Sequence, residues 1–293
     1  MKKLLYFAIT CVLLFVGCEP NNNNPDKPSN NSNFSSKGFT VDEYGKKVVF
    51  SQGNLQYHPK NNLWRFAEKQ TDFISDTIML DYMDINNLNL SPSYDGWVDV
   101  FGWGTGANPT HASLDDFIDW GRNKIGNDAA GTWYTLSGDE WYYVTNERAN
   151  APFLIGVAQV DGVNGLILLP DDWECPKDII FRSGFYDDYA SFQTFTTEQW
   201  SKMEHAGAVF LPAAGSLSQD YYNYVNFLVL ENVGTHGFYW TRGGKNTLRF
   251  DCLGVALDDL PASDNRYGYQ TLGPGYFCKG RVRLVKTYLD GYR

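Results

Sequence analysis

The sequence predicts an α+β fold, and three observations lead to that prediction. Apolar residues alternate with polar ones along much of the chain, which is the period of a half-buried β-strand. Three short segments interrupt this pattern with helical spacing and helix-start signals. The strands and helices do not follow a regular β–α–β order, which argues against a parallel α/β sheet. With 43% hydrophobic residues, the chain can bury a substantial core.

The first residues predict a targeting signal rather than a part of the fold. MKKLLYFAITCVLLFVGC has two lysines, a short apolar run and Gly17 before Cys18. We interpret residues 1–17 as a bacterial lipoprotein signal peptide and Cys18 as the lipidated first residue of the mature chain. An ordinary secretory signal or an uncleaved anchor is the alternative. Residues 18–37 are almost devoid of apolar side chains, so we expect a disordered Asn/Pro/Ser tether.

The rest of the chain predicts one domain over residues 38–288, followed by a tail over residues 289–293. No second break in composition follows Lys37. The formal net charge is −10, which argues against nucleic acid as a partner because phosphate recognition needs basic patches.

The element predictions begin with a β-hairpin. Residues 48–57 and 63–67 alternate on either side of HPKNN, where Pro59 would start the turn. Helices are expected over residues 113–126, 137–149 and 196–207. Ser113 would cap the first helix, while the second and third begin with capping boxes, Ser137 with Glu140 and Thr196 with Gln199. Gly207 would end the third helix.

The last part of the chain contains two further strand signals. FYWTR and TLRFD flank GGKN, which indicates a hairpin over residues 238–251. GRVRLVK, residues 280–286, is expected to be a closing strand with Val282 and Leu284 facing inward.

One apolar segment occurs twice. GLILLPDDW begins at Gly165 and GAVFLPAAG begins at Gly207. Both predict short buried strands ended by a proline, which cannot donate a hydrogen bond to a ladder. We interpret the repeated part as framework, and we expect a surface loop after Pro170 and another after Pro212.

These two expected loops supply the candidate binding residues. Aromatic rings stack on sugar CH faces while carboxylates and amides bind hydroxyls, and tyrosine also serves protein contacts. The alternative is that the rings cover the domain's own strands. The candidates are Tyr186, Asp187, Asp188, Tyr189, Asp220, Tyr221, Tyr222, Asn223, Tyr224 and, from GTHGFYW, His236.

Cysteines and acids support no strong site prediction. Cys252 and Cys278 form the preferred candidate disulfide, with Cys175 left over. The acidic pairs at residues 171–172 and 258–259 have oxygen ligands for a hard cation, but exposed loop acids are usually solvated. The sequence predicts no cofactor and no metal site.

Several segments together resemble surface lipoproteins of Bacteroidetes. These proteins resemble the Fibrobacter succinogenes major paralogous domain and, through it, the C-type-lectin-like fold. The resemblance covers most of residues 48–286. The segments that carry it are SQGNLQY, WRFAE, GWVDVFGWGTG, WYTLSGDEWYYV, GVNGLILLPDDW, GAVFLPAAG, NVGTHGFYWT and GRVRLVK.

This resemblance implies a fold in which the first and last strands pair, bringing residues 48–50 against residues 282–285. It also implies a long loop region between the second helix and the final strands that carries the ligand surface. The folded part lacks the Trp-Asn-Asp and Glu-Pro-Asn motifs of calcium-dependent lectins. Formylglycine-generating enzymes share the lectin-like fold, but they depend on a close cysteine pair, whereas Cys252 and Cys278 are far apart in sequence.

The expected function is that of a non-catalytic cell-envelope lipoprotein that binds glycans or acts as an adhesin. The alternative is a structural or protein-interaction component of the envelope, such as part of a fimbria, and an enzyme is the weakest reading. The expected partners are therefore a glycan or an envelope protein, with lipid attachment through Cys18. The expected location is the outer membrane at the cell surface, with the periplasmic face as the alternative.

Overall fold

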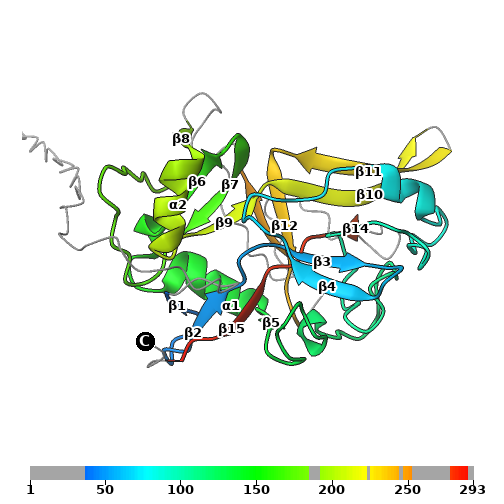
Figure 1. Cartoon of the computed structure of the whole chain (residues 1–293), viewed down its shortest axis with the longest axis horizontal. Helices are drawn as coiled ribbons and strands as arrows, with labels where there is room; N and C mark the ends of the chain where they lie inside the picture. The colour runs from blue at the N-terminus through cyan, green and yellow to red at the C-terminus, as the bar shows by residue number, and fades with distance from the viewer. Residues whose placement is uncertain (1–36, 185–191, 223–224, 244–246, 253–277, 290–293) are drawn as a thin grey trace, which may run out of the picture.

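The computed structural model describes residues 37–184, 192–222, 225–243, 247–252 and 278–289. The expected signal peptide and all of the expected tether except Lys37 lie outside these ranges. Within them the protein is mostly β-sheet with a few short helices, so the prediction of an α+β class is confirmed. Figure 1 shows the sheets, with β6–β9 and α2 at one end of the molecule and β3, β4, β10 and β11 at the other.

The two ends of the described chain meet in one sheet. Its strands follow the order β1-β2-β15-β5. In the antiparallel pair of β2 and β15, Phe50 lies opposite Val285 and Val48 opposite Thr287. The expected pairing of the first and last strands is therefore confirmed, with a register shifted toward the C-terminus. The strands are β1 (Phe39–Thr40), β2 (Lys47–Phe50), β5 (Tyr134–Thr135) and β15 (Leu284–Thr287).

The repeated segments form neighbouring strands of a second sheet, in the order β8-β6-β7-β9. Gly165 lies opposite Pro212 and Leu168 opposite Val209, so the two segments pair antiparallel with each other. Every residue of β9 is buried, which confirms the prediction of a buried framework strand. The strands are β6 (Ile155–Val160), β7 (Val163–Leu168), β8 (Gln193–Phe195) and β9 (Val209–Pro212).

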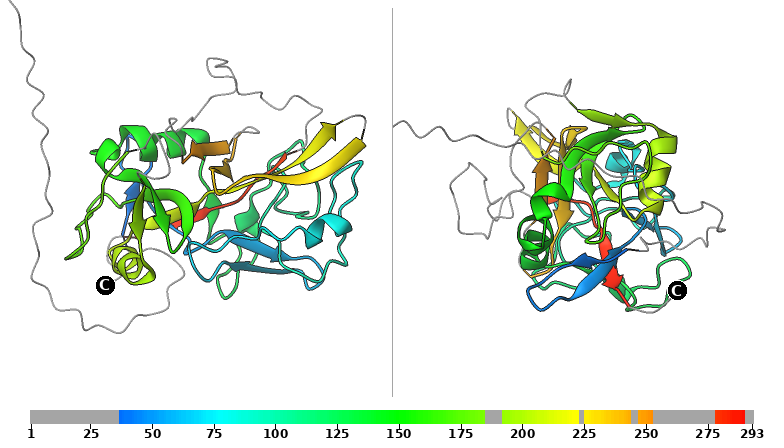
Figure 2. Two further views of the ribbon diagram at one scale, coloured as in Figure 1. Left: turned by 90° about the horizontal axis from the view of Figure 1, so that it is seen from above. Right: turned by 90° about the vertical axis from the view of Figure 1, so that its left-hand side faces the viewer.

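A third sheet has the order β11-β10-β12-β13, and β14 pairs with β10 beside this path. The antiparallel pair of β12 and β13 confirms the late hairpin. The loop expected after Pro212 is wrong, because the long strand β10 begins at Ala214, with one residue between it and the end of β9. The strands are β10 (Ala214–Tyr222), β11 (Val225–Val233), β12 (His236–Trp240), β13 (Thr247–Asp251) and β14 (Cys278–Lys279). In Figure 2, β10 and β11 form a long ribbon that reaches one end of the molecule.

The early hairpin is also present, as β3 (Leu55–His58) and β4 (Leu63–Phe66). It is shorter than expected, since residues 47–50 belong to the sheet of the termini. Val282 and Leu284 are both fully buried, as expected for the closing strand.

Two of the three expected helices are confirmed. The capping box of Ser137 and Glu140 starts α1 (Gly138–Tyr142), and the chain continues as a π-helical turn over Tyr143–Glu147. The capping box of Thr196 and Gln199 starts α2 (Thr197–His205), and Gly207 follows it with φ +98°. The short 3₁₀-helices are η1 (Ile78–Tyr82), η2 (Trp120–Arg122) and η4 (Ala151–Phe153).

The helix expected over residues 113–126 is wrong. Asp119, which would lie mid-helix, instead accepts hydrogen bonds from the N–H groups of Gly121 and Thr135, at 2.9 Å each. A Cβ on Gly121 would collide with the carbonyl oxygen of Trp133. Close packing and side-chain hydrogen bonds to the backbone therefore override helical spacing here.

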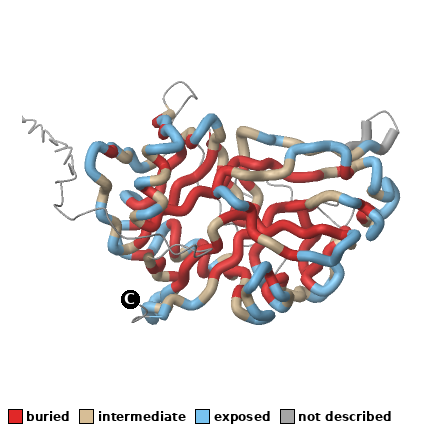
Figure 3. Tube along the Cα trace, in the orientation of Figure 1, coloured by how far each residue is buried: buried red, intermediate tan, exposed pale blue. Residues whose placement is uncertain are grey.

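The interior holds a ladder of side-chain donors beside β9 and β10. Three alternate carbonyl groups, those of Phe210, Pro212 and Ala214, accept hydrogen bonds from fully buried side chains. The donors, in that order, are Arg283, Tyr239 and Arg281. These side-chain donors take the place of a neighbouring strand, because buried backbone carbonyl groups need hydrogen-bond donors. The ladder joins the three sheets through the buried centre shown in Figure 3.

Candidate functional site

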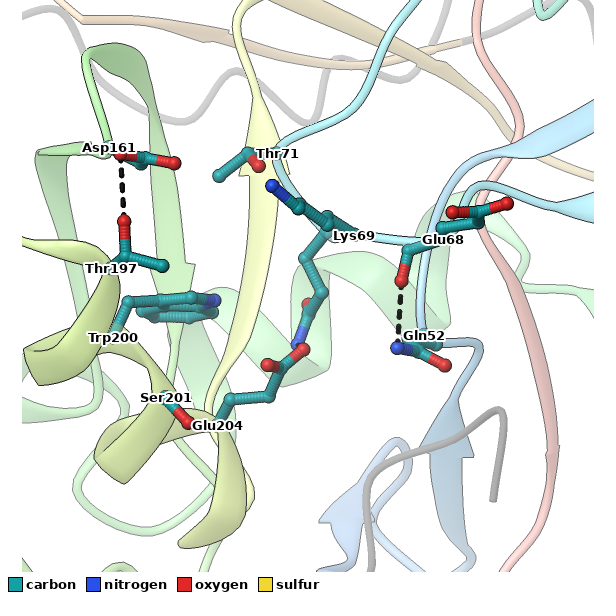
Figure 4. A pocket seen from close by; sticks show the side chains of 10 residues that line it. Gln52, Glu68, Lys69, Thr71, Asp161, Thr197, Trp200, Ser201 and Glu204 are labelled. Carbon is teal, nitrogen blue, oxygen red and sulfur yellow. Dashed lines mark hydrogen bonds between the residues drawn. The ribbon is translucent and has the colours of Figure 1, made fainter. Parts of the chain in front are cut away.

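A groove of about 220 Å³ lies between α2 and the segment that follows β4. Its walls come from parts of the chain that are far apart in sequence, and Figure 4 shows how the side chains converge. The lining residues are Gln52, Glu68, Lys69, Gln70, Thr71, Asp161, Thr197, Trp200, Ser201 and Glu204.

Helix α2 supplies one wall of the groove. Thr197, Ser201 and Glu204 are spaced at four and three residues, so they share one face of the helix. Trp200 and Met203 anchor the helix to the core. The Trp200 ring packs edge-on against Phe210 of β9 with ring centroids 5.7 Å apart, which fixes the indole at the base of the groove.

Buried Gln70 holds the opposite wall in place. Its side-chain amide donates to Glu204 Oε1 at 3.0 Å and to the Ala208 carbonyl at 3.1 Å. Its side-chain oxygen accepts from the Phe210 N–H at 2.7 Å. These bonds link the segment after β4 to both α2 and β9. Glu204 is thereby oriented by a buried partner rather than left free to rotate.

The rim of the groove is charged. Lys69 points toward Thr71 (Figure 4). Asp161, with φ +49° at the turn between β6 and β7, accepts a hydrogen bond from Thr197 at 2.9 Å. Together with Glu68 and Glu204, the lining holds three carboxylates and one ammonium group.

This arrangement suits a small polar ligand. Trp200 is 6% exposed, so only an edge of the indole reaches the groove and most ligand contacts would come from hydroxyl, amide and carboxylate groups. The volume lies below the ~300–1,000 Å³ of pockets for drug-sized molecules. One sugar ring, rather than a long chain, matches the groove in size and polarity.

Most of the residues predicted from the sequence are not in this groove. Tyr186, Asp187, Asp188, Tyr189, Asn223 and Tyr224 lie outside the described residues. The backbone of Asp220, Tyr221 and Tyr222 forms the end of β10, opposite residues 225–227 of β11. The structure therefore places three of the ten candidates on a strand that the sequence analysis expected to be a loop.

His236 lies at the start of β12. Its Nε2 is 3.3 Å from Asp251 Oδ2, and its Nδ1 is 2.8 Å from the Thr235 hydroxyl. Burial lowers the pKa of His236, and the opposing effect of Asp251 does not restore it. The folded state therefore favours the neutral ring. Protonation costs the folded protein more than the unfolded chain, so stability decreases as the pH falls below the ordinary histidine value of 6.5. The ring stacks on Phe238, an arrangement that orients the histidine within the sheet.

The acidic pair at residues 171–172 is not merely solvated. Asp171 accepts hydrogen bonds from the Thr40 hydroxyl at 2.6 Å and from the buried Arg148 at 3.1 Å. It therefore fastens the first strand to the loop after β7. Residues 258–259 lie outside the described part of the chain. Among the described residues, no group of three or more His, Cys, Asp or Glu side chains is placed to hold a metal ion.

The Cys252 side chain is buried, and in its thiol form burial raises its pKa to about 12. The side chain of Cys278 lies outside the described residues, so the Cys252–Cys278 disulfide stays a prediction. Cys175 is half-buried, and its thiol lies 3.4 Å from the Ile179 carbonyl oxygen.

Sequence reasoning missed the groove. Lys69 and Gln70 lie in one segment and Asp161 in another, neither segment carries a motif, and only the fold brings them together. The one available signal was the capping box at Thr196, because it fixes α2 and therefore the face that carries Thr197, Ser201 and Glu204.

Comparisons with protein-family models, with curated proteins and with solved structures find no match to this chain. Among the helices of the described ranges, none is long and apolar enough to cross a membrane.

Proposed function

We propose that this chain is a non-catalytic binding module of the bacterial cell envelope that recognises carbohydrate. The observation that carries the proposal is the groove beside α2, whose lining holds three carboxylates, one ammonium group, amides and hydroxyls together with Trp200. Sugar hydroxyls require hydrogen-bonding partners, and these polar groups can supply them, while the edge of Trp200 adds an apolar contact.

The groove is also organised before any ligand arrives. Gln70 fixes Glu204, and Thr197 is hydrogen-bonded to Asp161. A ligand therefore meets side chains that have already lost much of their freedom, which lowers the entropic cost of binding. The remaining candidate residues, in the tyrosine-rich segments, stay candidates for partner contacts.

The proposed envelope location and C-type-lectin-like fold have separate support. The location depends on the lipoprotein signal over residues 1–17 and on Cys18. Antiparallel pairing of β2 with β15 is a feature that the lectin-like fold requires. We propose this fold together with kinship to the Fibrobacter succinogenes major paralogous domain.

The test is a glycan array with the purified protein, run with calcium and then with chelator. On any sugar that binds, Glu204→Gln and Lys69→Met should each weaken affinity about tenfold, since a hydrogen bond to a charged group contributes about 1.5–3 kcal/mol. Lys60→Met is the matched control, because Lys60 is an exposed lysine on the β3–β4 turn whose partner is Asp95.

Other outcomes would redirect or overturn the proposal. Binding that survives both groove variants but is lost in Tyr222→Ala would move the site to the tyrosine-rich segments. Binding that disappears with chelator would assign a cation to the acidic residues. A blank array with folded protein would overturn sugar recognition and favour the alternative, a structural or protein-interaction component of the envelope.

A further inference from the structure

Strand β11 lies at the edge of its sheet. It spans nine residues, VNFLVLENV, and pairs with β10 on one side from Val225 to Glu231 and again at Val233, while Asn232, at φ +61°, has no partner in the ladder. Within the described residues no strand pairs with its other side. An edge of this length presents a row of backbone N–H and C=O groups that can pair with another chain.

The strand is apolar but not buried. Phe227 is 41% exposed and Val233 is 37% exposed, while Leu228, Val229 and Leu230 are half-buried. The strands of the second sheet differ, since β9 is buried throughout. Proteins usually protect long edges with lysines, prolines or bulges. In VNFLVLENV the only charged residue is Glu231.

The sequence of β11 is nearly symmetric about Val229. Leucine lies on both sides of Val229, asparagine lies three residues away in both directions, and valine lies four residues away in both directions. Only Phe227 and Glu231 break the symmetry. An antiparallel pair of identical strands centred on Val229 therefore places like residues opposite each other.

We propose that β11 pairs with β11 of a second copy of this chain, antiparallel and about a two-fold axis at Val229. In this arrangement Val229 faces Val229 of the second copy, Leu228 faces Leu230, and Phe227 faces Glu231. Like charges directly opposite each other destabilise an antiparallel pair, and this register places no like charges opposite each other. The interface is isologous, so it closes at two copies instead of growing into a fibre. The β10–β11 sheets of both copies become one continuous sheet.

The ribbon of β10 and β11 in Figure 2 reaches the end of the molecule, and among the described strands β11 is the outermost of its sheet. Pairing would also cover Phe227 and Val229, which lie on one face of the strand, and Leu228, which lies on the other. Leu230, on the same face as Leu228, already packs against the core, so the apolar residues that a second copy would newly cover are Phe227, Leu228 and Val229.

The register can be tested with single cysteines in the full-length chain. V229C should give a disulfide-linked dimer on a non-reducing gel under mild oxidation, because directly opposed residues have Cα atoms about 4.5–5.5 Å apart. F227C is the matched control. Its counterpart in the second copy lies four residues along the strand, about 13 Å away, which is too far for a disulfide. The unsubstituted chain controls for the native cysteines.

A second variant tests the interface without cross-linking. Val229→Lys places two ammonium groups opposite each other, so sedimentation should show at least a tenfold weaker dimer, whereas Val229→Thr should retain it. A monomer at all concentrations overturns the proposal. Equal cross-linking of V229C and F227C overturns the register, and a dimer that V229C does not cross-link places the interface elsewhere.

Discussion

At the scale of single residues, the two glycines of the repeated segments have different roles. Gly165 lies within β7, where a Cβ would collide with the Leu211 carbonyl oxygen and the Phe210 ring. Gly207 follows α2 with φ +98°, a conformation that side chains disfavour. The repeated segments thus form two paired strands, whereas each glycine is needed for a local reason: Gly165 for close packing and Gly207 for its positive φ.

Gly165→Ala should therefore destabilise the protein by about 1–3 kcal/mol, because overpacking forces β7 and β9 apart. Urea unfolding at constant pH measures this change. Gly38→Ala is the control, since its Cβ would meet only Lys47 Cδ and the Tyr288 ring, at 3.3 and 3.4 Å. Equal losses for the two variants would contradict the steric explanation.

At the scale of elements, the start of α1 combines a cap with an ion-pair cluster. Glu140 accepts the Ser137 N–H, and its Oε1 lies 2.8 Å from Lys46 Nζ and 3.0 Å from Arg242. Burial alone would raise the pKa of Glu140, but these partners outweigh it and hold the pKa below its ordinary value. One carboxylate therefore joins α1 to the turn before β2 and to the end of β12.

This lowered pKa has a defined sign in the dependence of stability on pH. The contribution of Glu140 is complete above the ordinary glutamate value of 4.5 and is lost as the pH falls through the lower folded value. Glu140→Gln should therefore be less stable than the parent at neutral pH and lose less stability on acidification. Thermal unfolding from pH 7 to pH 3 measures this, and parallel curves for the two proteins would contradict it.

Elements with local signals could be predicted from the sequence. The capping boxes at Ser137 and Thr196 gave both α-helices, and the hairpins followed from turn residues between alternating segments. The helix expected over residues 113–126 failed because Asp119 bonds to Thr135, sixteen residues away. The groove could not be predicted for the same reason, since Gln70 and Glu204 meet only through tertiary structure.

At the scale of the whole molecule, the side-chain ladder beside β9 holds the sheets together. Arg281 also lies 3.4 Å from Asp99, and both side chains are fully buried. Burial raises the pKa of the Asp99 carboxyl. The guanidinium of Arg281 acts in the opposite direction, because it favours the charged carboxylate. Removal of one member of such a pair leaves the other without compensation in the interior.

Arg281→Met should consequently destabilise the protein by about 3–5 kcal/mol, and Asp99→Asn in the same chain should recover part of that loss. Urea unfolding of both variants measures the coupling. Lys60→Met removes an exposed ion pair with Asp95 and should change stability little. A loss for Arg281→Met no larger than that of the control would show that the ladder does not hold the sheets together.

The position of β15 determines when folding can finish. This strand pairs with both β2 and β5, and the donors Arg281 and Arg283 lie just before it, about seventy residues after the carbonyl groups they bind. During synthesis the first strands cannot complete their sheet until residues 284–287 have been added. Such long-range contacts make folding slow, because distant segments must meet before they are stabilised. A ribosome-bound chain that ends before residue 280 should accordingly stay protease-sensitive.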